Sequence, residues 1–215
     1  MLKAVIFDLD GVICSTDEYH YRAWKEMADS MGIRFDREIN NRLRGVSRMA
    51  SLEIILERYT GEPLSEEQKE KLAARKNEIY RRLLANMGPG DLSDEVKSTL
   101  DALRASGLKL GIGSSSRNTP YILERIGLKG YFDAVSDGNN ITHSKPDPEV
   151  FLKGAAYLGE TPDECLVVED AVSGAQAGHA GGFRVACVGD ASEAQAGDFN
   201  LSAFSELLEI VRSLM

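Results

Sequence analysis

Hydrophobic residues fall into short apolar runs that alternate with helical patterns over most of the chain. The first run covers residues 2–6, and similar runs, each typical of a buried strand, follow at residues 108–113, 134–136, 165–168 and 183–188. Between and after them, the sequence predicts helices at residues 94–106, 120–126, 145–158 (opened by two prolines), 171–180 and 203–214. This alternation predicts an α/β fold with a mainly parallel sheet and right-handed crossovers.

Residues 14–87 have a different pattern, with helical periodicity and little that resembles a strand. Helices are expected around residues 19–28, 36–43, 51–59 and 65–84. The last of these begins at Ser65, which is followed by acidic residues suited to a first helical turn. A Gly-Pro-Gly breaker at residues 88–90 then marks the return to the α/β pattern. We therefore expect an α/β core at residues 1–14 and 88–215 and an inserted helical domain at residues 15–87.

Composition narrows the class of protein. The 215 residues are 43% hydrophobic and 27% charged, with a net charge of -9. An acidic chain of this kind is not expected to bind nucleic acid or an anionic membrane surface. The three cysteines lack metal-binding spacing and are expected to be buried thiols. With no signal peptide and no membrane-length apolar run, we expect a cytoplasmic protein.

Two carboxylates and a glycine follow the first predicted strand. Asp8 and Asp10, two residues apart, precede Gly11. Residues two apart on a strand share a face, and open α/β sheets bind ligands at the carboxyl ends of their strands. A plain strand and turn would also explain this pattern, so its meaning depends on polar residues elsewhere.

Three further polar clusters stand after predicted strands or at a helix start. They are Ser114, Lys145, and the pair Glu169 and Asp170. Each has a structural explanation on its own, as a cap, a solvated charge or a favourable helix start, but four coincidences together are improbable. Their chemistry is consistent with phosphoryl transfer, because carboxylate oxygens suit Mg²⁺ and a lysine can stabilise phosphoryl oxygens.

These residues can be given roles in such a reaction. Asp8 and Asp170 would ligate Mg²⁺, and Asp8 would attack phosphorus as a nucleophile. Asp10 would protonate the leaving oxygen and later deprotonate the acceptor. Ser114 and Lys145 would bind the phosphoryl oxygens during transfer.

Other sites fit the sequence less well. The glycines at residues 111–113 resemble part of a dinucleotide loop, but Ser116 stands where the third glycine would be. A P-loop lysine motif is absent, and the strand at residues 108–113 lacks the phosphorylated aspartate that a receiver domain requires. A binding protein without catalysis is disfavoured because every charged group that the chemistry needs is present.

In order and context, the four clusters resemble the motifs of the haloacid dehalogenase superfamily of phosphotransferases. The resemblance implies a Rossmann-like core, a helical cap domain inserted after the first strand, and an aspartyl-phosphate intermediate on Asp8. It also implies obligatory Mg²⁺, with Asp10 contributing its backbone carbonyl. Glu169 would act either as a direct ligand or as a support for the ligands. The predicted metal residues are Asp8, Asp10, Glu169 and Asp170.

Within that superfamily, the β-phosphoglucomutase group is the nearest resemblance, through residues 12–24, 43–48, 75–77 and 114–131. A mutase that works through a bisphosphate needs a second anion site, and Arg48 in a turn between helices suits it. The resemblance adds Arg117, in place of an expected lysine, and Asn118. It implies that Lys76 contacts the sugar, that Thr16 lies at a hinge, and that His20 orients Asp10. Trp24 fits the sugar site and a plain core position about equally well.

The remaining predicted substrate contacts are Gly45, Val46, Ser47, Ser51, Ser115 and Ser116. The implied reaction interconverts β-glucose 1-phosphate and glucose 6-phosphate, with small sugar phosphates as partners and a monomer as the family expectation. The alternative is a sugar-phosphate phosphatase of the same fold. The Pro-Gly pair usual after the cap in this family is absent at residues 92–95. We draw no functional conclusion from its absence.

Overall fold

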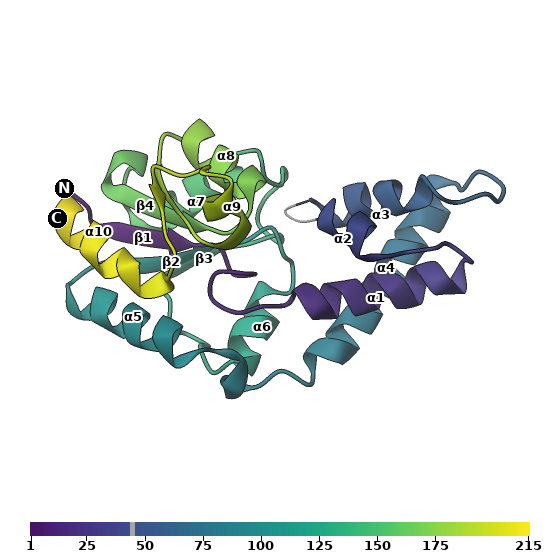
Figure 1. Cartoon of the computed structure of the whole chain (residues 1–215), viewed down its shortest axis with the longest axis horizontal. Helices are drawn as coiled ribbons and strands as arrows, with labels where there is room; N and C mark the ends of the chain where they lie inside the picture. The colour runs from purple at the N-terminus through teal and green to yellow at the C-terminus, as the bar shows by residue number, and fades with distance from the viewer. Residues whose placement is uncertain (44–45) are drawn as a thin grey trace. The chain divides into compact units, whose positions relative to one another are not determined.

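The computed structural model describes residues 1–43 and 46–215 of the chain (Figure 1). It divides into two compact units, a first unit of Met1–Ser15 with Gly88–Met215 and a second unit of Thr16–Met87. The insert thus starts at Thr16, whereas the sequence pattern placed its start at residue 15. Among the described residues, every helix is too short or too polar to cross a membrane.

A single parallel sheet of six strands forms the centre of the first unit, in the order β3-β2-β1-β4-β5-β6. The strands are β1 (Ala4–Phe7), β2 (Lys109–Gly113), β3 (Ala134–Ser136), β4 (Cys165–Glu169), β5 (Arg184–Cys187) and β6 (Phe199–Asn200). Strand β1 lies between β2 and β4, with Phe7 in register with Ile112 on one side and Val168 on the other. The residues that follow these three strands therefore lie along one edge of the sheet, as a Rossmann-like fold predicts.

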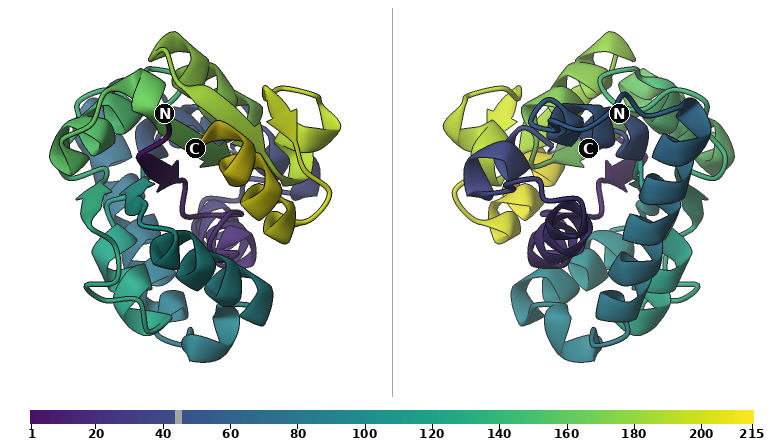
Figure 2. Two further views of the ribbon diagram at one scale, coloured as in Figure 1. Left: turned by 90° about the vertical axis from the view of Figure 1, so that its left-hand side faces the viewer. Right: turned by 90° about the vertical axis from the view of Figure 1, so that its right-hand side faces the viewer.

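Helices cover both faces of this sheet. They are α5 (Asp94–Ala105), α6 (Thr119–Arg125), α7 (Glu149–Leu158), α8 (Val172–Ala180), α9 (Gly189–Glu193) and α10 (Leu207–Leu214). Helices α7 and α8 lie on one face, whereas α5 and α10 lie side by side on the other (Figures 1 and 2). Short 3₁₀ turns stand at Pro89–Asp91, Pro162–Glu164 and Phe204–Glu206.

Strand β2 is unusually close to helix α7 because of its glycines. A Cβ on Gly113 would lie 2.6 Å from the Phe151 ring, and one on Gly111 would lie 3.0 Å from Leu158. Only glycine permits such an approach of strand and helix. These glycines therefore serve sheet–helix packing, which explains the glycine pattern that partly resembled a dinucleotide loop.

Buried thiols also belong to the core of the first unit. Cys14, Cys165 and Cys187 are all free and buried, as the sequence predicted. Burial raises the pKa of Cys165 and of Cys187 to about 12. Both are therefore protonated at neutral pH and unsuited to nucleophilic or metal-binding roles.

Helices are the only regular elements in the described part of the second unit. Its helices are α1 (Asp17–Ser30), α2 (Arg37–Asn41), α3 (Arg48–Leu56) and α4 (Glu66–Leu84). Helix α4 begins with a capping box in which Ser65 and Gln68 bond each other's backbone N–H groups, confirming the predicted start. Helix α3 begins three residues earlier than its hydrophobic pattern indicated, because Ser47 caps it by accepting from the Ala50 N–H.

Candidate active site

Asp8 stands directly after β1 and is nearly buried, with 7% of its surface exposed. Its backbone N–H donates to the Val168 carbonyl at 2.9 Å, which continues the β1–β4 ladder by one residue. The Asp8 carboxylate accepts a hydrogen bond from the Lys145 ammonium group. The strand end therefore holds a carboxylate at a fixed place in a largely dry environment.

Lys145 lies between two carboxylates. Its buried ammonium group donates to both Asp8 and Glu169. Burial alone would lower the pKa of Lys145, but the charges of Asp8 and Glu169 outweigh it and hold that pKa above its ordinary value. Lys145 is therefore a permanent cation, which suits a group that stabilises charge on a phosphoryl oxygen.

Glu169 is the last residue of β4 and is 1% exposed. One of its carboxylate oxygens accepts from the backbone N–H groups of Asp170 and Ala171, both at 2.9 Å. Burial raises the pKa of Glu169, whereas Lys145 and the Ala171 N–H oppose that rise. Glu169 thus orients Lys145 on one side and the turn that carries Asp170 on the other.

Two glycines make room for these carboxylates. A Cβ on Gly11, where φ is 84°, would lie 2.0 Å from an Asp170 oxygen, and a Cβ on Gly174 would lie 1.9 Å from a Glu169 oxygen. Any other residue would displace the acidic side chain. The sequence pattern used Gly11 only as a turn residue and did not single out Gly174. The signal that could have identified Gly174 is its place in the first turn of a predicted helix that directly follows two acidic residues.

Negative charge exceeds positive charge at this edge of the sheet. Burial, with the charges of Glu169, Asp8 and Asp10 in addition, raises the pKa of Asp170 to about 9. Lys145 alone opposes that rise. Such a cluster of oxygen donors lacks positive charge, and a hard divalent cation would supply it. The residues present therefore fit a cation of the Mg²⁺ type.

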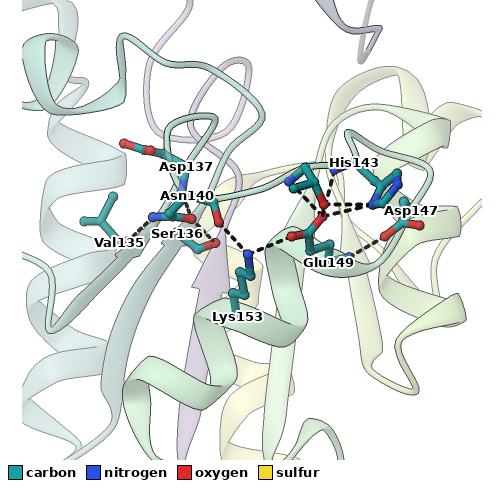
Figure 3. Close-up of polar contacts among 9 residues, drawn as sticks. Val135, Ser136, Asp137, Asn140, His143, Asp147, Glu149 and Lys153 are labelled. Atoms are coloured by element: carbon teal, nitrogen blue, oxygen red, sulfur yellow. Dashed lines mark hydrogen bonds and ion pairs between the residues drawn. The ribbon is translucent and has the colours of Figure 1, made fainter.

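Lys145 belongs to the segment between β3 and α7. Glu149 anchors this segment through the polar contacts drawn in Figure 3. One Glu149 oxygen accepts from the backbone N–H of Thr142 at 2.9 Å and of His143 at 2.7 Å. The other pairs with Lys153 at 2.7 Å, and Lys153 also donates to the Asn140 carbonyl. These contacts hold the pKa of Glu149 well below its usual range. The hydrogen bond from Lys153 has the largest effect on that pKa, and the His143 N–H has the next largest.

This same segment holds a group of possible metal ligands in the described part of the chain. Donor atoms of His143, Asp147 and Glu149 all lie within 4.8 Å of one another. However, both Glu149 oxygens are already used by backbone N–H groups and by Lys153. We therefore assign this group to the anchoring of the segment and not to a metal.

The loop after β2 carries Ser114 and the predicted substrate contacts that follow it, up to Asn118. Ser114 is 3% exposed, and its hydroxyl accepts from the Ser116 N–H at 3.2 Å. Arg117 donates through Nε to the Gly138 carbonyl at 3.1 Å. A Cβ on Gly138 would lie 2.4 Å from the Ser115 carbonyl oxygen, so the turn after β3 packs directly on this loop. Asn118 is also buried and stands before α6.

Other predicted residues form a cluster within the second unit. The Lys76 ammonium lies 2.8 Å from Nδ1 of His20. It also lies 4.7 Å from the centre of the Trp24 ring and 4.6 Å from that of Tyr80. Tyr80 was not among the predicted site residues, although it stands one helical turn after Lys76. The second unit therefore brings His20, Trp24 and Lys76 together.

Arg48 is part of a different contact in this unit. Its guanidinium donates to the side-chain oxygen of Asn77 at 2.9 Å, a residue the sequence had not assigned to the site. The remaining predictions are placed as follows: Thr16 is buried before α1, Ser47 caps α3, Ser51 is buried in α3, Val46 is half-buried, and Gly45 lies outside the described residues.

Comparisons with known proteins identify the family and the fold of the chain. A sequence model of the haloacid dehalogenase-like hydrolases matches residues 2–182. The chain is 40% identical to "Beta-phosphoglucomutase" of Bacillus subtilis over 96% of its own length and 92% of that protein. It is 35% identical to "Fructose-1-phosphate phosphatase YqaB" of Escherichia coli, over 83% of this chain and 92% of that one.

A solved structure shares the fold over the full length. The crystal structure of β-phosphoglucomutase from Clostridium difficile superposes with a TM-score of 0.92 at 33% identity, covering 100% of this chain and 97% of the other. The six-stranded parallel sheet and the family match over residues 2–182 agree with one another. The chain belongs to the haloacid dehalogenase-like hydrolase family.

Proposed function

We propose that this protein is a β-phosphoglucomutase that interconverts β-glucose 1-phosphate and glucose 6-phosphate. The observation that carries the phosphoryl chemistry is the buried contact of Lys145 with Asp8 and Glu169. Similarity to β-phosphoglucomutase over nearly the whole chain, residues 16–87 included, supports the mutase and its sugar. The proposed partners are small sugar phosphates.

In this proposal, Asp8 is the nucleophile. Its free carboxylate oxygen attacks phosphorus, the bond from phosphorus to the sugar oxygen breaks, and Asp10 gives that oxygen a proton. Ser114 and Lys145 hold the transferring phosphoryl oxygens. The resulting aspartyl phosphate passes its phosphoryl group to the free hydroxyl of a sugar monophosphate, from which Asp10 removes a proton. The bound β-glucose 1,6-bisphosphate so formed then turns over and returns its other phosphoryl group to Asp8 by the same attack.

Mg²⁺ is the proposed cofactor, held by Asp8, Asp10, Asp170 and, directly or through the other ligands, Glu169. The carboxylate excess that raises the pKa of Asp170 to about 9 supports this assignment. When bound, such an ion offsets the repulsion between the Asp8 carboxylate and a phosphate. The acidic residues of this chain orient one another, since Glu169 holds both Lys145 and the turn before α8.

A mutase must also hold a second phosphate, and we assign that task to Arg48, Arg117 and Asn118. Guanidinium groups bind phosphate through two parallel hydrogen bonds. The contact of Arg48 with Asn77 and that of Arg117 with the Gly138 carbonyl restrict both side chains before a ligand binds. The proposed contacts to the sugar come from Lys76, Trp24 and the serine-rich loop at residues 114–116, with His20 and Thr16 serving closure.

A sugar-phosphate phosphatase is the second candidate. Its support is the 35% identity to the fructose-1-phosphate phosphatase of E. coli. Both candidates use the same aspartyl phosphate and differ only in whether a sugar hydroxyl or water accepts the phosphoryl group. Free thiols and a net charge of -9 support a cytoplasmic enzyme with no affinity for nucleic acid. A monomer is proposed from the resemblance.

The test is a phosphate-balance assay. The protein is incubated with Mg²⁺, β-glucose 1-phosphate and a trace of glucose 1,6-bisphosphate, and glucose 6-phosphate and free phosphate are followed together. A mutase forms glucose 6-phosphate with little free phosphate. Release of free phosphate in step with loss of substrate would instead establish the phosphatase.

The matched control for this assay is Asp8→Asn, which keeps the size of the side chain and removes the nucleophile. It should reduce both products by about 10⁴-fold or more. Asp94→Asn, an exposed position at the start of α5, should behave as the unmodified protein. Appreciable turnover by the Asp8 variant would contradict the nucleophile assignment for both candidate functions.

A further inference from the structure

A buried lysine in the second unit has two aromatic neighbours. Lys76 lies on α4 and is 3% exposed. Its ammonium is 4.6 Å from the centre of the Tyr80 ring and 4.7 Å from that of the Trp24 ring. The negative face of an aromatic ring attracts a cation, most strongly where water is excluded. The two rings therefore fix where this ammonium group can lie.

The contact between Lys76 and His20 determines which ring nitrogen of the histidine carries the proton. An ammonium group has hydrogens to donate and no lone pair to accept with. At 2.8 Å from Lys76, Nδ1 of His20 must therefore be the acceptor. A neutral imidazole with an accepting Nδ1 carries its hydrogen on Nε2.

The environment also keeps the imidazole neutral. Burial first, and then the charges of Lys76 and Arg48, place the pKa of His20 well below its ordinary value. A protonated ring would have two N–H groups and would lose the acceptor that Lys76 uses. At neutral pH, His20 is thus an N–H donor at Nε2 and nowhere else.

Tyr80 touches both members of this pair. Its ring is 1% exposed and its centre lies 4.1 Å from that of the His20 ring, with 30° between the planes. Tyr80 follows Lys76 by one helical turn on α4, and Trp24 follows His20 by one turn on α1. Spacing of four residues places both members of each pair on one helix face.

We propose that Tyr80 is a positioning residue, which with Trp24 holds Lys76 against Nδ1 of His20 so that Nε2 is a permanent hydrogen-bond donor to an anionic oxygen in the reaction. The role of this donor in turnover rests on the proposed phosphomutase function. The arrangement of these four side chains is independent of that function, because all four belong to the second unit and contact one another within it.

The experiment observes the histidine rings of the full-length protein labelled with ¹⁵N. Two-bond couplings between carbon-bound hydrogens and ring nitrogens distinguish the two neutral tautomers from the protonated ring. His20→Asn identifies which signals belong to His20. We expect an unprotonated Nδ1 and a protonated Nε2, unchanged between about pH 8 and about pH 6. A hydrogen on Nδ1 in the unmodified protein would overturn the proposal.

Two variants then test the role of the ring. Tyr80→Phe keeps the aromatic face and should leave the His20 signals unchanged. Tyr80→Leu removes that face and should give mixed tautomers or protonation near pH 6. Leu84→Ala, a fully buried change on the same helix, is the control for loosened packing and should leave the tautomer intact. An unchanged His20 pattern in Tyr80→Leu would refute the positioning role.

Kinetics complete the test. If the phosphomutase proposal also holds, Tyr80→Leu should lower kcat roughly tenfold or more with a smaller change in KM, since misplaced catalytic groups are costly. Tyr80→Phe should restore kcat to within about twofold. Absence of mutase activity in the unmodified protein, with the expected His20 signals, would reject the proposed function and leave the His20–Lys76–Tyr80 arrangement standing.

Discussion

At the scale of single residues, the charges of the first unit depend on one another. Lys145 is buried and donates to Asp8 and Glu169. Removal of one member of such a group leaves an uncompensated buried charge, which is more costly than the loss of a surface ion pair. The three side chains therefore act as one unit, and single substitutions among them are not expected to be additive.

His20 provides a prediction at this same scale, in the pH dependence of stability. Its pKa is well below the ordinary value of 6.5 in the folded chain, so the unfolded chain binds the proton more readily. Stability is then complete above the unfolded pKa and falls as pH decreases below it, by up to about 1.4 kcal/mol per pH unit. We expect His20→Asn to flatten the decrease in Tm between pH 7.5 and pH 5.5.

The control for that measurement is His143→Asn. The side chain of His143 is 71% exposed, and its replacement should not flatten the decrease. Thermal unfolding followed by circular dichroism gives both comparisons. If Tm decreased equally with falling pH in His20→Asn and in the unmodified protein, His20 would not be held neutral in the folded chain.

At the scale of elements, the segment between β3 and α7 determines where Lys145 lies. Glu149 begins α7 and accepts hydrogen bonds from two residues near the middle of that segment. Lys153, one turn later, joins Glu149 to the Asn140 carbonyl. The first turn of the helix thus organises the segment that precedes it.

We predict that Glu149→Gln lowers turnover without touching the reacting groups. The amide keeps the shape but loses the charge that attracts Lys153 and the backbone N–H groups, so Lys145 becomes less well positioned. A loss of roughly tenfold in kcat is expected, with a lower Tm at neutral pH. Turnover of β-glucose 1-phosphate and thermal unfolding measure the two effects.

Glu193→Gln serves as the matched control, because this glutamate is exposed at the end of α9. It should change neither quantity. A lower Tm in Glu149→Gln with an unaltered kcat would mean that the segment is stabilised by Glu149 but that Lys145 is positioned without it.

At the scale of the whole molecule, two units each gather polar residues that are far apart in the sequence. The first brings Lys145 to Asp8, and the second brings Lys76 to His20 and Asn77 to Arg48. If the protein is a mutase, substitutions in the second unit should reduce turnover of sugar phosphates more than cleavage of a small phosphate ester that lacks the sugar. This separation can be measured by comparing two substrates.

We predict that Arg48→Ala separates the two activities. A hydrogen bond to a charged group contributes about 1.5–3 kcal/mol, so kcat/KM for β-glucose 1-phosphate should fall about 10- to 100-fold. Cleavage of a small aryl phosphate, which has no second phosphate, should stay within about twofold. Steady-state assays on both substrates give the comparison.

Arg82→Ala is the control for this prediction, since Arg82 is an exposed residue of α4 paired with Glu26. It should leave both substrates unaffected. Equal losses on both substrates in Arg48→Ala would mean that Arg48 supports the fold of the second unit and does not bind a distal phosphate.

The sequence predicted helices and strands best where a local signal, such as an apolar run or a helix cap, marked the ends of the element. The apolar run at 134–136 became β3 with the same bounds, and the Ser65 capping signal became the start of α4. Helix α7 begins at Glu149, later than the pattern at 145–148 indicated, because each proline disfavours helical geometry in the residue before it. Strand β6 has two residues and no apolar run, so only its pairing with β5 makes it a strand.

By itself, the sequence determined the alternation of strands and helices, the helical insert and the acidic residues at the strand ends. Periodicity, caps and breakers are local, and a single chain displays them. Tertiary structure alone decided that Lys145 lies between Asp8 and Glu169, that Gly11 and Gly174 make room for acids, and that Tyr80 joins His20 and Lys76. Such contacts depend on which surfaces pack together, and packing is settled only when distant segments meet.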